Sequence, residues 1–486
     1  MSQDSAAGGR QPDFIARTGL WVGLLAAGLI LLLPPPEGLT APAWRTFAVM
    51  VLMVTWWVCE AIPIPATALT PLLLFPLLGV MPIRETALSY SDPVIYLFIG
   101  GFLIALSFER WRLHARLALL VASRLGAQPA MLLGAFMLSA ILLSMWISNT
   151  AATLMLIPIA MGVARGVYPA GELQTKFASA LALGVAYAAT IGGVGTPVGS
   201  PPNLIAIAFL ERQGVHVSFL GWMAVATPVM LLLAPLAWWT LARTLPRAHG
   251  DHDAARRVLA SELRALGPIS NAERRLIIVF ILVASAWVLR GWLNTLPGLD
   301  GLTDTGVAMA GALALFLLPS GNLASPRTKL ADWSLGAKLP WGVVLLYGGG
   351  LAIAAAMEST GLAAWIGTVL GFLGSWPALL VIVVMAAITV WASELMSNTA
   401  TITSLLPVIG AVTVATGFDP RYLMLPMAIA ASFGFMLPVS TPPNSIAYAT
   451  GLVPQRQMLS AGWRLNLYSI FIAALLGYLL VPHVIQ

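Results

Sequence analysis

Long stretches of this chain contain no charged side chain, and they constrain its fold more than any other feature. No Asp, Glu, Lys or Arg occurs from Leu125 to Ala164 or from Leu395 to Phe418. Apolar runs of about 17–25 residues, the length that crosses a bilayer, recur throughout. Only 9% of the 486 residues are charged, against about 25% in soluble proteins. Because the runs are continuous rather than alternating, they favour helices over a barrel. The sequence predicts an all-α polytopic membrane protein.

Composition also excludes several classes of function. A single cysteine, Cys59, rules out an intramolecular disulfide and a cysteine-based metal cage. The five histidines form no metal-binding pattern. The net charge of +6 is explained by the excess of Lys and Arg in cytoplasmic loops, so no nucleic-acid partner is expected. Residues 1–17 lack a cleavage pattern and are predicted to be a cytoplasmic tail.

The apolar runs divide the chain into two similar halves. We expect the first transmembrane helix within 18–41, repeat 1 at 42–242, a cytoplasmic linker at 243–275 and repeat 2 at 276–486. Repeat 1 has predicted spans at about 42–59, 63–83, 93–107, 127–164, 177–210 and 219–242. Repeat 2 has them at about 276–292, 304–320, 341–371, 375–415, 422–452 and 463–481. The linker contains AARRVLASELRAL, which predicts a surface helix.

Two motifs occur once in each half. Ser148-Asn149-Thr150 is repeated as Ser397-Asn398-Thr399, 249 residues later. A Pro-Pro-Asn triplet interrupts the span near 201–203 and again, 241 residues later, near 442–444. A single Ser-Asn-Thr in a membrane helix is usually a packing contact between helices. Matching interruptions in two halves instead indicate the binding site of a transporter.

Positive charges predict how the chain crosses the membrane. If each half crosses five times, the second half is inverted relative to the first. With the N-terminus inside and the C-terminus outside, 20 of the 25 Lys and Arg residues are cytoplasmic. The five predicted to lie outside are Arg45, Arg84, Arg212, Arg290 and Arg421. Whether each Ser-Asn-Thr element is a re-entrant hairpin or two full spans is left open by this count.

The two motifs have the chemistry of an ion-binding site. Ser, Thr and Asn supply hydroxyl and amide groups, and a broken helix adds backbone groups that have no intrahelical partner. Helix N-termini favour an anion, whereas carbonyl oxygens at the preceding C-termini suit a hard cation such as Na⁺. Asn203 and Asn444 are expected to cap the helices that follow them. No Lys, Arg or His lies in either copy of the two motifs. We therefore expect an anion to be bound together with cations.

At these motifs the sequence resembles the divalent anion/sodium symporter family of dicarboxylate and citrate transporters. The matching segments are ISNTAATLMLIP, MSNTATITSLLP, GGVGTPVGSPPN and SFGFMLPVSTPPNSIA, with CEAIPIPATALTPLLLFPLLG at 59–79. The resemblance covers nearly the whole chain after the first span. It implies an inverted-repeat homodimer with two re-entrant hairpins, at about 127–164 and 375–415. It also implies an elevator-like movement of a transport domain against a fixed scaffold.

The resemblance further implies which residues bind ligands. The implied substrate-binding residues are Ser148, Asn149, Thr150, Ser200, Ser397, Asn398, Thr399, Thr441 and Pro442. One implied Na⁺ site comprises Ser144, Ser148, Asn149 and Gly199. The other comprises Ser393, Met396, Asn398 and Ser440.

The function expected is secondary active transport of C4 dicarboxylates such as succinate, malate and fumarate across the inner (plasma) membrane, coupled to Na⁺. A Na⁺-independent dicarboxylate exchanger and a citrate or sulfate carrier are alternatives. An intramembrane enzyme would need an acid, base, nucleophile or metal cluster at depth, and the sequence offers none. No catalytic residue or organic cofactor is therefore expected. An ion channel is a third alternative, because polar helix tips can line a pore.

Overall fold

The computed structural model describes residues 14–124, 126, 128–246, 251–321 and 327–484. The regular elements in these residues are all helices, and Pro319 and Lys329 form an isolated bridge. Nearly all of the predicted N-terminal tail lies outside the described residues, and α1 (Phe14–Leu32) is the first helix. Eleven helices in the described part of the chain are long and apolar enough to cross a membrane. The prediction of an all-α polytopic membrane protein is confirmed.

The chain forms two compact units, and the two units do not coincide with the two sequence repeats. The first unit contains the described residues up to Ser91, together with Trp341–Ser375 and Thr403–Gly417. The second contains the described residues of Asp92–Pro340, Trp376–Ile402 and Phe418–Gln486. Helix α19 (Asn398–Thr416) contributes to both.

The first unit is built around helices α2 (Ala41–Cys59) and α16 (Trp341–Thr360). Trp57 of α2 and Ile353 of α16 belong to one buried cluster with Phe75. The unit also contains the following shorter elements: α3 (Ile64–Thr67), α4 (Thr70–Leu77), α5 (Ile83–Leu88), η1 (Ser89–Ser91), α17 (Leu362–Val369) and η3 (Gly371–Ser375).

Two predicted spans in this unit are divided. Residues 63–83 form the short helices α3 and α4 because proline interrupts them: Pro71 has no N–H to continue the hydrogen bonding of α3. The span predicted at 341–371 ends at Thr360, because Gly361 adopts a left-handed conformation with φ 81°.

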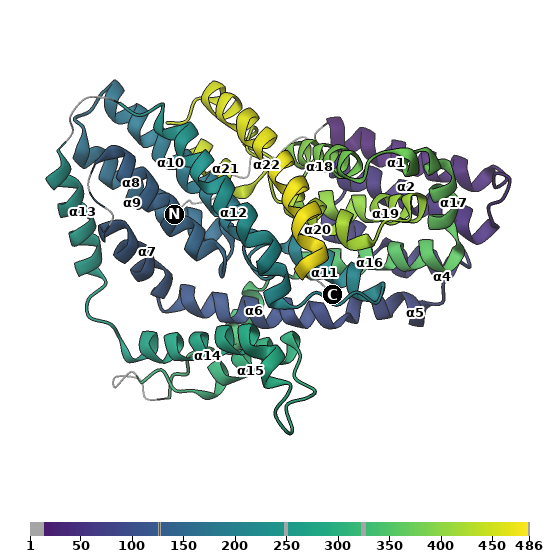
Figure 1. Ribbon diagram of the computed structural model, residues 1–486, viewed down its shortest axis with the longest axis horizontal. Coiled ribbons are helices and arrows are strands. Elements are labelled where there is room, and N and C mark those ends of the chain that lie inside the picture. The colour runs from purple at the N-terminus through teal and green to yellow at the C-terminus, as the bar shows by residue number, and fades with distance from the viewer. Residues whose placement is uncertain (1–13, 125, 127, 247–250, 322–326, 485–486) are drawn as a thin grey trace, which may run out of the picture. The chain divides into compact units, whose positions relative to one another are not determined.

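The second unit contains the remaining helices (Figure 1). From the first half of the chain these are α6 (Pro93–Arg110), α7 (Leu113–Arg124), α8 (Pro129–Ser144), α9 (Asn149–Val167), α10 (Glu172–Gly193), α11 (Pro201–Arg212), α12 (Phe219–Ala242) and α13 (His252–Ala265). From the second half they are α14 (Asn271–Leu293), α15 (Asp304–Leu317), η2 (Trp333–Lys338), α18 (Ala378–Leu395), α20 (Pro420–Ala431), α21 (Pro442–Ala449) and α22 (Gln455–Val484).

Small residues let α10 pack closely in the centre of this unit. A Cβ atom added to Gly192 would lie only 2.6 Å from the carbonyl oxygen of Ile141 in α8. Close backbone approach of this kind is how helices associate inside a membrane, where the hydrophobic effect does not drive them together. α10 contacts α8, α9, α12 and α21 (Figure 1). It therefore contacts both α9, which begins in the first Ser-Asn-Thr tripeptide, and α21, which begins in the second Pro-Pro-Asn triplet.

The predicted linker helix is present as α13. It packs against α7 and α9 on one side of the second unit (Figure 1). The next helix, α14, is also attached to α7: Arg116 Nε of α7 lies 2.6 Å from Glu273 Oε1 of α14. Glu273 in turn forms a capping box with Ser270 at the start of α14.

Candidate functional site

The first Ser-Asn-Thr tripeptide lies where α8 gives way to α9. Ser148 caps α9, and its hydroxyl accepts a hydrogen bond from the Ala151 N–H at 3.1 Å. The Ser144 hydroxyl, at the end of α8, donates to the amide oxygen of Asn149. Ser144 is fully buried, whereas Ser148, Asn149 and Thr150 are half-buried. The tripeptide therefore places partly exposed polar groups next to the buried Ser144.

Aromatic rings fix the connection that precedes this tripeptide. The ring of Trp146 stacks on those of Phe219 and Trp287, at centroid distances of 6.1 and 6.5 Å. Phe219 and Trp287 stack on each other at 4.3 Å. This packing holds the residues immediately before Ser148 against α12 and α14.

The first broken span contributes the backbone on the other side of Asn149. α10 ends at Gly193 and α11 begins at Pro201. The side-chain nitrogen of Asn203 donates to the carbonyl oxygens of Gly193, at 2.9 Å, and Thr196, at 2.8 Å. Ser200, not Asn203, occupies the N-cap position of α11, so the predicted capping role of Asn203 is wrong. Its side-chain amide instead links α11 to the end of α10 and to the connecting segment.

Backbone oxygens converge where this break meets the tripeptide. A Cβ added to Gly199 would lie 2.6 Å from Gly193 O, 2.9 Å from Ser144 O and 3.1 Å from Met145 O. A Cβ added to Gly193 would lie 2.6 Å from the side-chain oxygen of Asn149. Glycine at 199 leaves room for three carbonyl oxygens to gather, and glycine at 193 leaves room for the side chain of Asn149, whose oxygen also contacts the Ser144 hydroxyl. Such hard oxygen ligands suit an alkali cation.

The second tripeptide repeats this arrangement between α18 and α19. The Ser393 hydroxyl lies 2.8 Å from the side-chain oxygen of Asn398 and 2.7 Å from Ala431 O. The side-chain nitrogen of Asn398 donates to Ser432 O at 2.9 Å. The Ser397 hydroxyl accepts from the Ala400 N–H at 3.3 Å. Met396 ends α18 in an extended conformation.

The second break is also fastened by an asparagine. Asn444 donates to the carbonyl oxygens of Gly434, at 2.9 Å, and Leu437, at 3.1 Å. These acceptors lie 10 and 7 residues before Asn444, the same separations as in the first break. The Ser440 hydroxyl also contacts Gly434 O, at 3.1 Å. Thr441 caps α21, so the capping role predicted for Asn444 is wrong too.

The two breaks lie side by side. The hydroxyls of Ser200 and Ser432 are 3.3 Å apart, and both are buried. Ser432 O is the acceptor of Asn398, and Ser200 directly follows Gly199. A continuous series of polar contacts therefore joins the second tripeptide to the first break. A role for Ser432 was not predicted, although it begins the segment SFGFMLPVSTPPNSIA, because it lies outside the two repeated triplets and only the fold reveals its contacts.

The structure brings several of the predicted site residues close to one another. Ser144, Asn149 and the Gly199 backbone lie together, as do Ser393 and Asn398. Ser200, Thr441 and Pro442 lie at the starts of α11 and α21. Asn203 and Asn444 each retain a buried side-chain oxygen with no hydrogen-bond partner. Among the described residues, no three His, Cys, Asp or Glu side chains gather in a way that could hold a metal ion.

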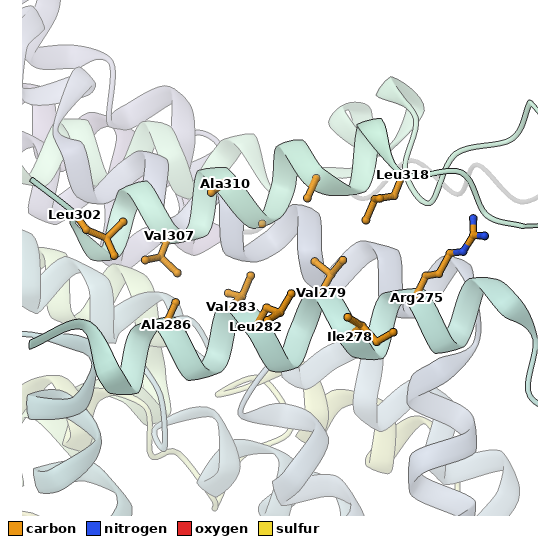
Figure 2. Close-up of a pocket in the computed structure, with 12 residues that line it drawn as sticks. Arg275, Ile278, Val279, Leu282, Val283, Ala286, Leu302, Val307, Ala310 and Leu318 are labelled. Atoms are coloured by element: carbon orange, nitrogen blue, oxygen red, sulfur yellow. The ribbon is translucent and has the colours of Figure 1, made fainter. Parts of the chain in front are cut away.

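A separate groove lies between α14 and α15 (Figure 2). Its volume is about 500 Å³, and aliphatic side chains such as Val283, Val307 and Leu318 line it. Arg275 stands at one end, as Figure 2 shows. A second cavity of about 510 Å³ includes Arg165, Gln174 and Thr450 in its lining. Neither cavity is lined by a residue of the two tripeptides.

Comparison with known proteins places the chain among membrane transporters. Residues 17–485 match the family described as the sodium:sulfate symporter transmembrane region. The chain belongs to this family. The resemblance to divalent anion/sodium symporters predicted from the motifs is thereby confirmed, and the protein is a transporter rather than an enzyme.

Curated relatives and a solved structure agree with this assignment. The sodium-dependent dicarboxylate transporter SdcS of Staphylococcus saprophyticus is 37% identical, covering 96% of this chain and 92% of the relative. SdcS of Staphylococcus aureus strain MRSA252 is 35% identical over the same shares of the two chains. The structure of Neisseria gonorrhoeae MtrF, from a class of antimetabolite efflux pumps, shares the fold. Its TM-score is 0.58 at 14% identity, covering 93% of this chain and 96% of MtrF.

Proposed function

We propose that the protein is a secondary active transporter that carries C4 dicarboxylates across the inner membrane together with Na⁺. The observation that carries this proposal is the pair of matching half-sites. Each combines a Ser-Asn-Thr tripeptide, a buried serine five residues before its asparagine and a broken helix fastened by a second asparagine. Two similar half-sites suit a substrate with two similar anionic ends. The SdcS relatives are named sodium-dependent dicarboxylate transporters, which supports both the substrate and the cation.

The proposed substrate ligands are the two tripeptides with the residues at the starts of α11 and α21. Helix N-termini present N–H groups and partial positive charge to carboxylates. These ligands are Ser148, Asn149, Thr150, Ser200, Ser397, Asn398, Thr399, Thr441 and Pro442.

The proposed cation ligands lie beside them. Na⁺ would be held at one half-site by Ser144, Ser148, Asn149 and Gly199, and at the other by Ser393, Met396, Asn398 and Ser440. The convergence of carbonyl oxygens at Gly199 supports the first set. The contact of Ser440 with Gly434 O supports the second, because it gathers hydroxyl and carbonyl oxygens near Ser393.

The wider mechanism extends the same proposal. Two inverted repeats with re-entrant hairpins formed by α8–α9 and α18–α19 would bring the tripeptides together from opposite faces of the membrane. An elevator movement requires separate rigid bodies, and the division into two compact units supports it. A homodimer would supply the fixed scaffold.

Uptake into proteoliposomes tests the proposal. Purified protein is reconstituted, and radiolabelled succinate uptake is measured with an inward Na⁺ gradient, with choline in place of Na⁺ and with internal succinate. We expect concentrative uptake only with the Na⁺ gradient. Uptake driven by internal dicarboxylate alone would identify an exchanger. Competition by citrate or sulfate stronger than by malate or fumarate would indicate the alternative substrates.

A further inference from the structure

Glu394 is a buried carboxylate at the centre of the second half-site. It lies in the last turn of α18, directly after Ser393, and is only 3% exposed. One of its oxygens, Oε1, accepts hydrogen bonds from Phe435 N at 2.7 Å and Met436 N at 2.8 Å. The other, Oε2, accepts from Leu437 N at 3.0 Å. Three successive backbone N–H groups of the break therefore point at one carboxylate.

A side chain from α22 completes this arrangement. Asn466 donates its side-chain N–H to Glu394 Oε1 at 2.7 Å and is fully buried. Successive backbone N–H groups at a chain break form a concave anion site, and hydrogen bonds to an ionised acceptor are about twice as strong as neutral ones. The protein therefore fills the anion site of its second break with a carboxylate of its own.

The same break is held from its other side. Asn444 donates to the carbonyls of Gly434 and Leu437, while Glu394 accepts from the N–H groups of residues 435–437. All three N–H groups of residues 435–437, and the carbonyl oxygens of Gly434 and Leu437, thus have partners within the protein.

The first half-site has no equivalent of this carboxylate. The tripeptide offset of 249 residues places Met145 at the position of Glu394, and a thioether is only a weak acceptor. The break offset of 241 residues matches Phe435, Met436 and Leu437 with residues 194–196. There the hydroxyl of Thr196 instead donates to the backbone oxygen of Met145. The N–H groups of Val194 and Gly195 donate to the neutral carbonyl oxygen of Gly192, not to a carboxylate.

We propose that Glu394 is a positioning residue that fixes the backbone of the second break around a preformed half-site, whereas the backbone of the first break is held by neutral hydrogen bonds and is tightened further when its ligand binds. This inference rests on the proposed function, which supplies the ligand of the first half-site. It predicts that the two halves of a nearly symmetrical site differ in rigidity before ligand arrives.

Hydrogen exchange of backbone amides tests the inference directly. The full-length protein in lipid nanodiscs is compared in choline and in Na⁺ buffer, without substrate. In choline, we expect the amides of Phe435, Met436 and Leu437 to exchange at least ~10-fold more slowly than those of residues 194–196. The reason is that the free energy of local opening should be higher at 435–437 by about the strength of one charge-assisted hydrogen bond. Na⁺ should then slow exchange at 194–196 and leave 435–437 unchanged. Equal rates in choline would overturn the inference.

Substitutions identify the carboxylate as the cause. E394Q keeps the size of the side chain but replaces one carboxylate oxygen with an NH₂ group, which faces hydrogen-bond donors instead of accepting from them. Exchange at 435–437 should therefore accelerate at least ~10-fold, the factor expected for losing one charge-assisted hydrogen bond. N466L removes one of the four bonds and keeps the carboxylate, so it should act in the same direction but less. E358Q, which alters an exposed glutamate of α16, should change neither segment. Unchanged protection at 435–437 in both E394Q and N466L would overturn the inference.

Failure of the inference can be told apart from failure of the proposed function. The exchange measurement at 435–437 requires no transport, so it stands even if succinate is not carried. If succinate slows exchange at 194–196 and Na⁺ does not, the inference is supported and Na⁺ coupling is contradicted.

Discussion

Asn149 and Asn398 are the residues on which the proposed transport most directly depends. Each places its side-chain oxygen against a buried serine hydroxyl five residues earlier. Replacing either by alanine removes that oxygen from the site. In Asn149→Ala, Ser144 loses its acceptor, and a buried group left without one costs about 1–3 kcal/mol. In Asn398→Ala, Ser393 keeps Ala431 O as acceptor, but Ser432 O loses the donor that Asn398 supplies.

We therefore expect both variants to reduce Na⁺-driven succinate uptake to background and to lower the melting temperature. Uptake is measured in proteoliposomes, and folding by size-exclusion chromatography and thermal unfolding in detergent. Asn271→Ala provides a control, because this asparagine is exposed at the start of α14. Wild-type uptake by either site variant would contradict its assignment.

Sequence patterns predicted these asparagines because duplication distinguishes them from ordinary packing residues. They did not predict the role of Ser432 or Glu394. A hydroxyl next to a helix break is common in sequence, and a glutamate near the end of an apolar run is usually interfacial. Only the folded chain shows that Ser432 contacts Ser200 and that Glu394 faces three N–H groups. The asparagines of the Pro-Pro-Asn triplets were recognised, but their bonds run back across the break rather than forward to a cap.

At the scale of elements, the start of α20 offers a prediction about pH. Asp419 caps this helix through the Arg421 N–H at 2.9 Å, and the two side chains form an ion pair. The side-chain hydrogen bond from Arg421 lowers the pKa of Asp419 below its usual 3.8. A depressed pKa means that the carboxylate stabilises the fold above pH 3.8 and that this contribution is lost as pH falls through the folded-state pKa.

Asp419→Asn should remove the ion pair and keep the cap, since asparagine caps helices as well as aspartate does. At pH 7 we expect the variant to be less stable by no more than ~1 kcal/mol, because the side chains of the pair are 24% and 30% exposed. The difference in melting temperature between wild type and variant should shrink as pH falls below 3.8 and through the lowered pKa of Asp419. Thermal unfolding measured from pH 7 to pH 3 checks this, and a difference that grows on acidification would contradict it.

Element boundaries were predictable where length and composition alone decide them. α2, α6, α12 and α14 lie close to the predicted spans because predominantly apolar runs of that length have few alternatives. The region 63–83 was wrong as one span because its prolines interrupt hydrogen bonding. α7 was not predicted, since its charged residues mask a buried face that includes Leu113, Ala118 and Leu119.

At the scale of the whole molecule, the division into compact units does not follow the order of the two repeats along the chain. Each compact unit takes segments from both sequence repeats: the first combines residues up to Ser91 with Trp341–Ser375 and Thr403–Gly417. Sequence similarity between the halves reports how the chain was duplicated, whereas the units depend on which helices pack together. A repeat boundary at 243–275 therefore could not predict them.

Inversion of the two repeats remains the strongest prediction made at this scale. Gln213 follows the broken span of repeat 1, and Gln455 follows that of repeat 2; both are exposed. Counting Lys and Arg places the first outside and the second in the cytoplasm. The only cysteine is Cys59, so Cys59→Ala provides a background for single cysteines. In intact cells, we expect a membrane-impermeant maleimide to label Gln213→Cys, and to label Gln455→Cys only after the membrane is opened. Labelling of both from the same side would show that the repeats are parallel and would remove the basis for two opposed half-sites.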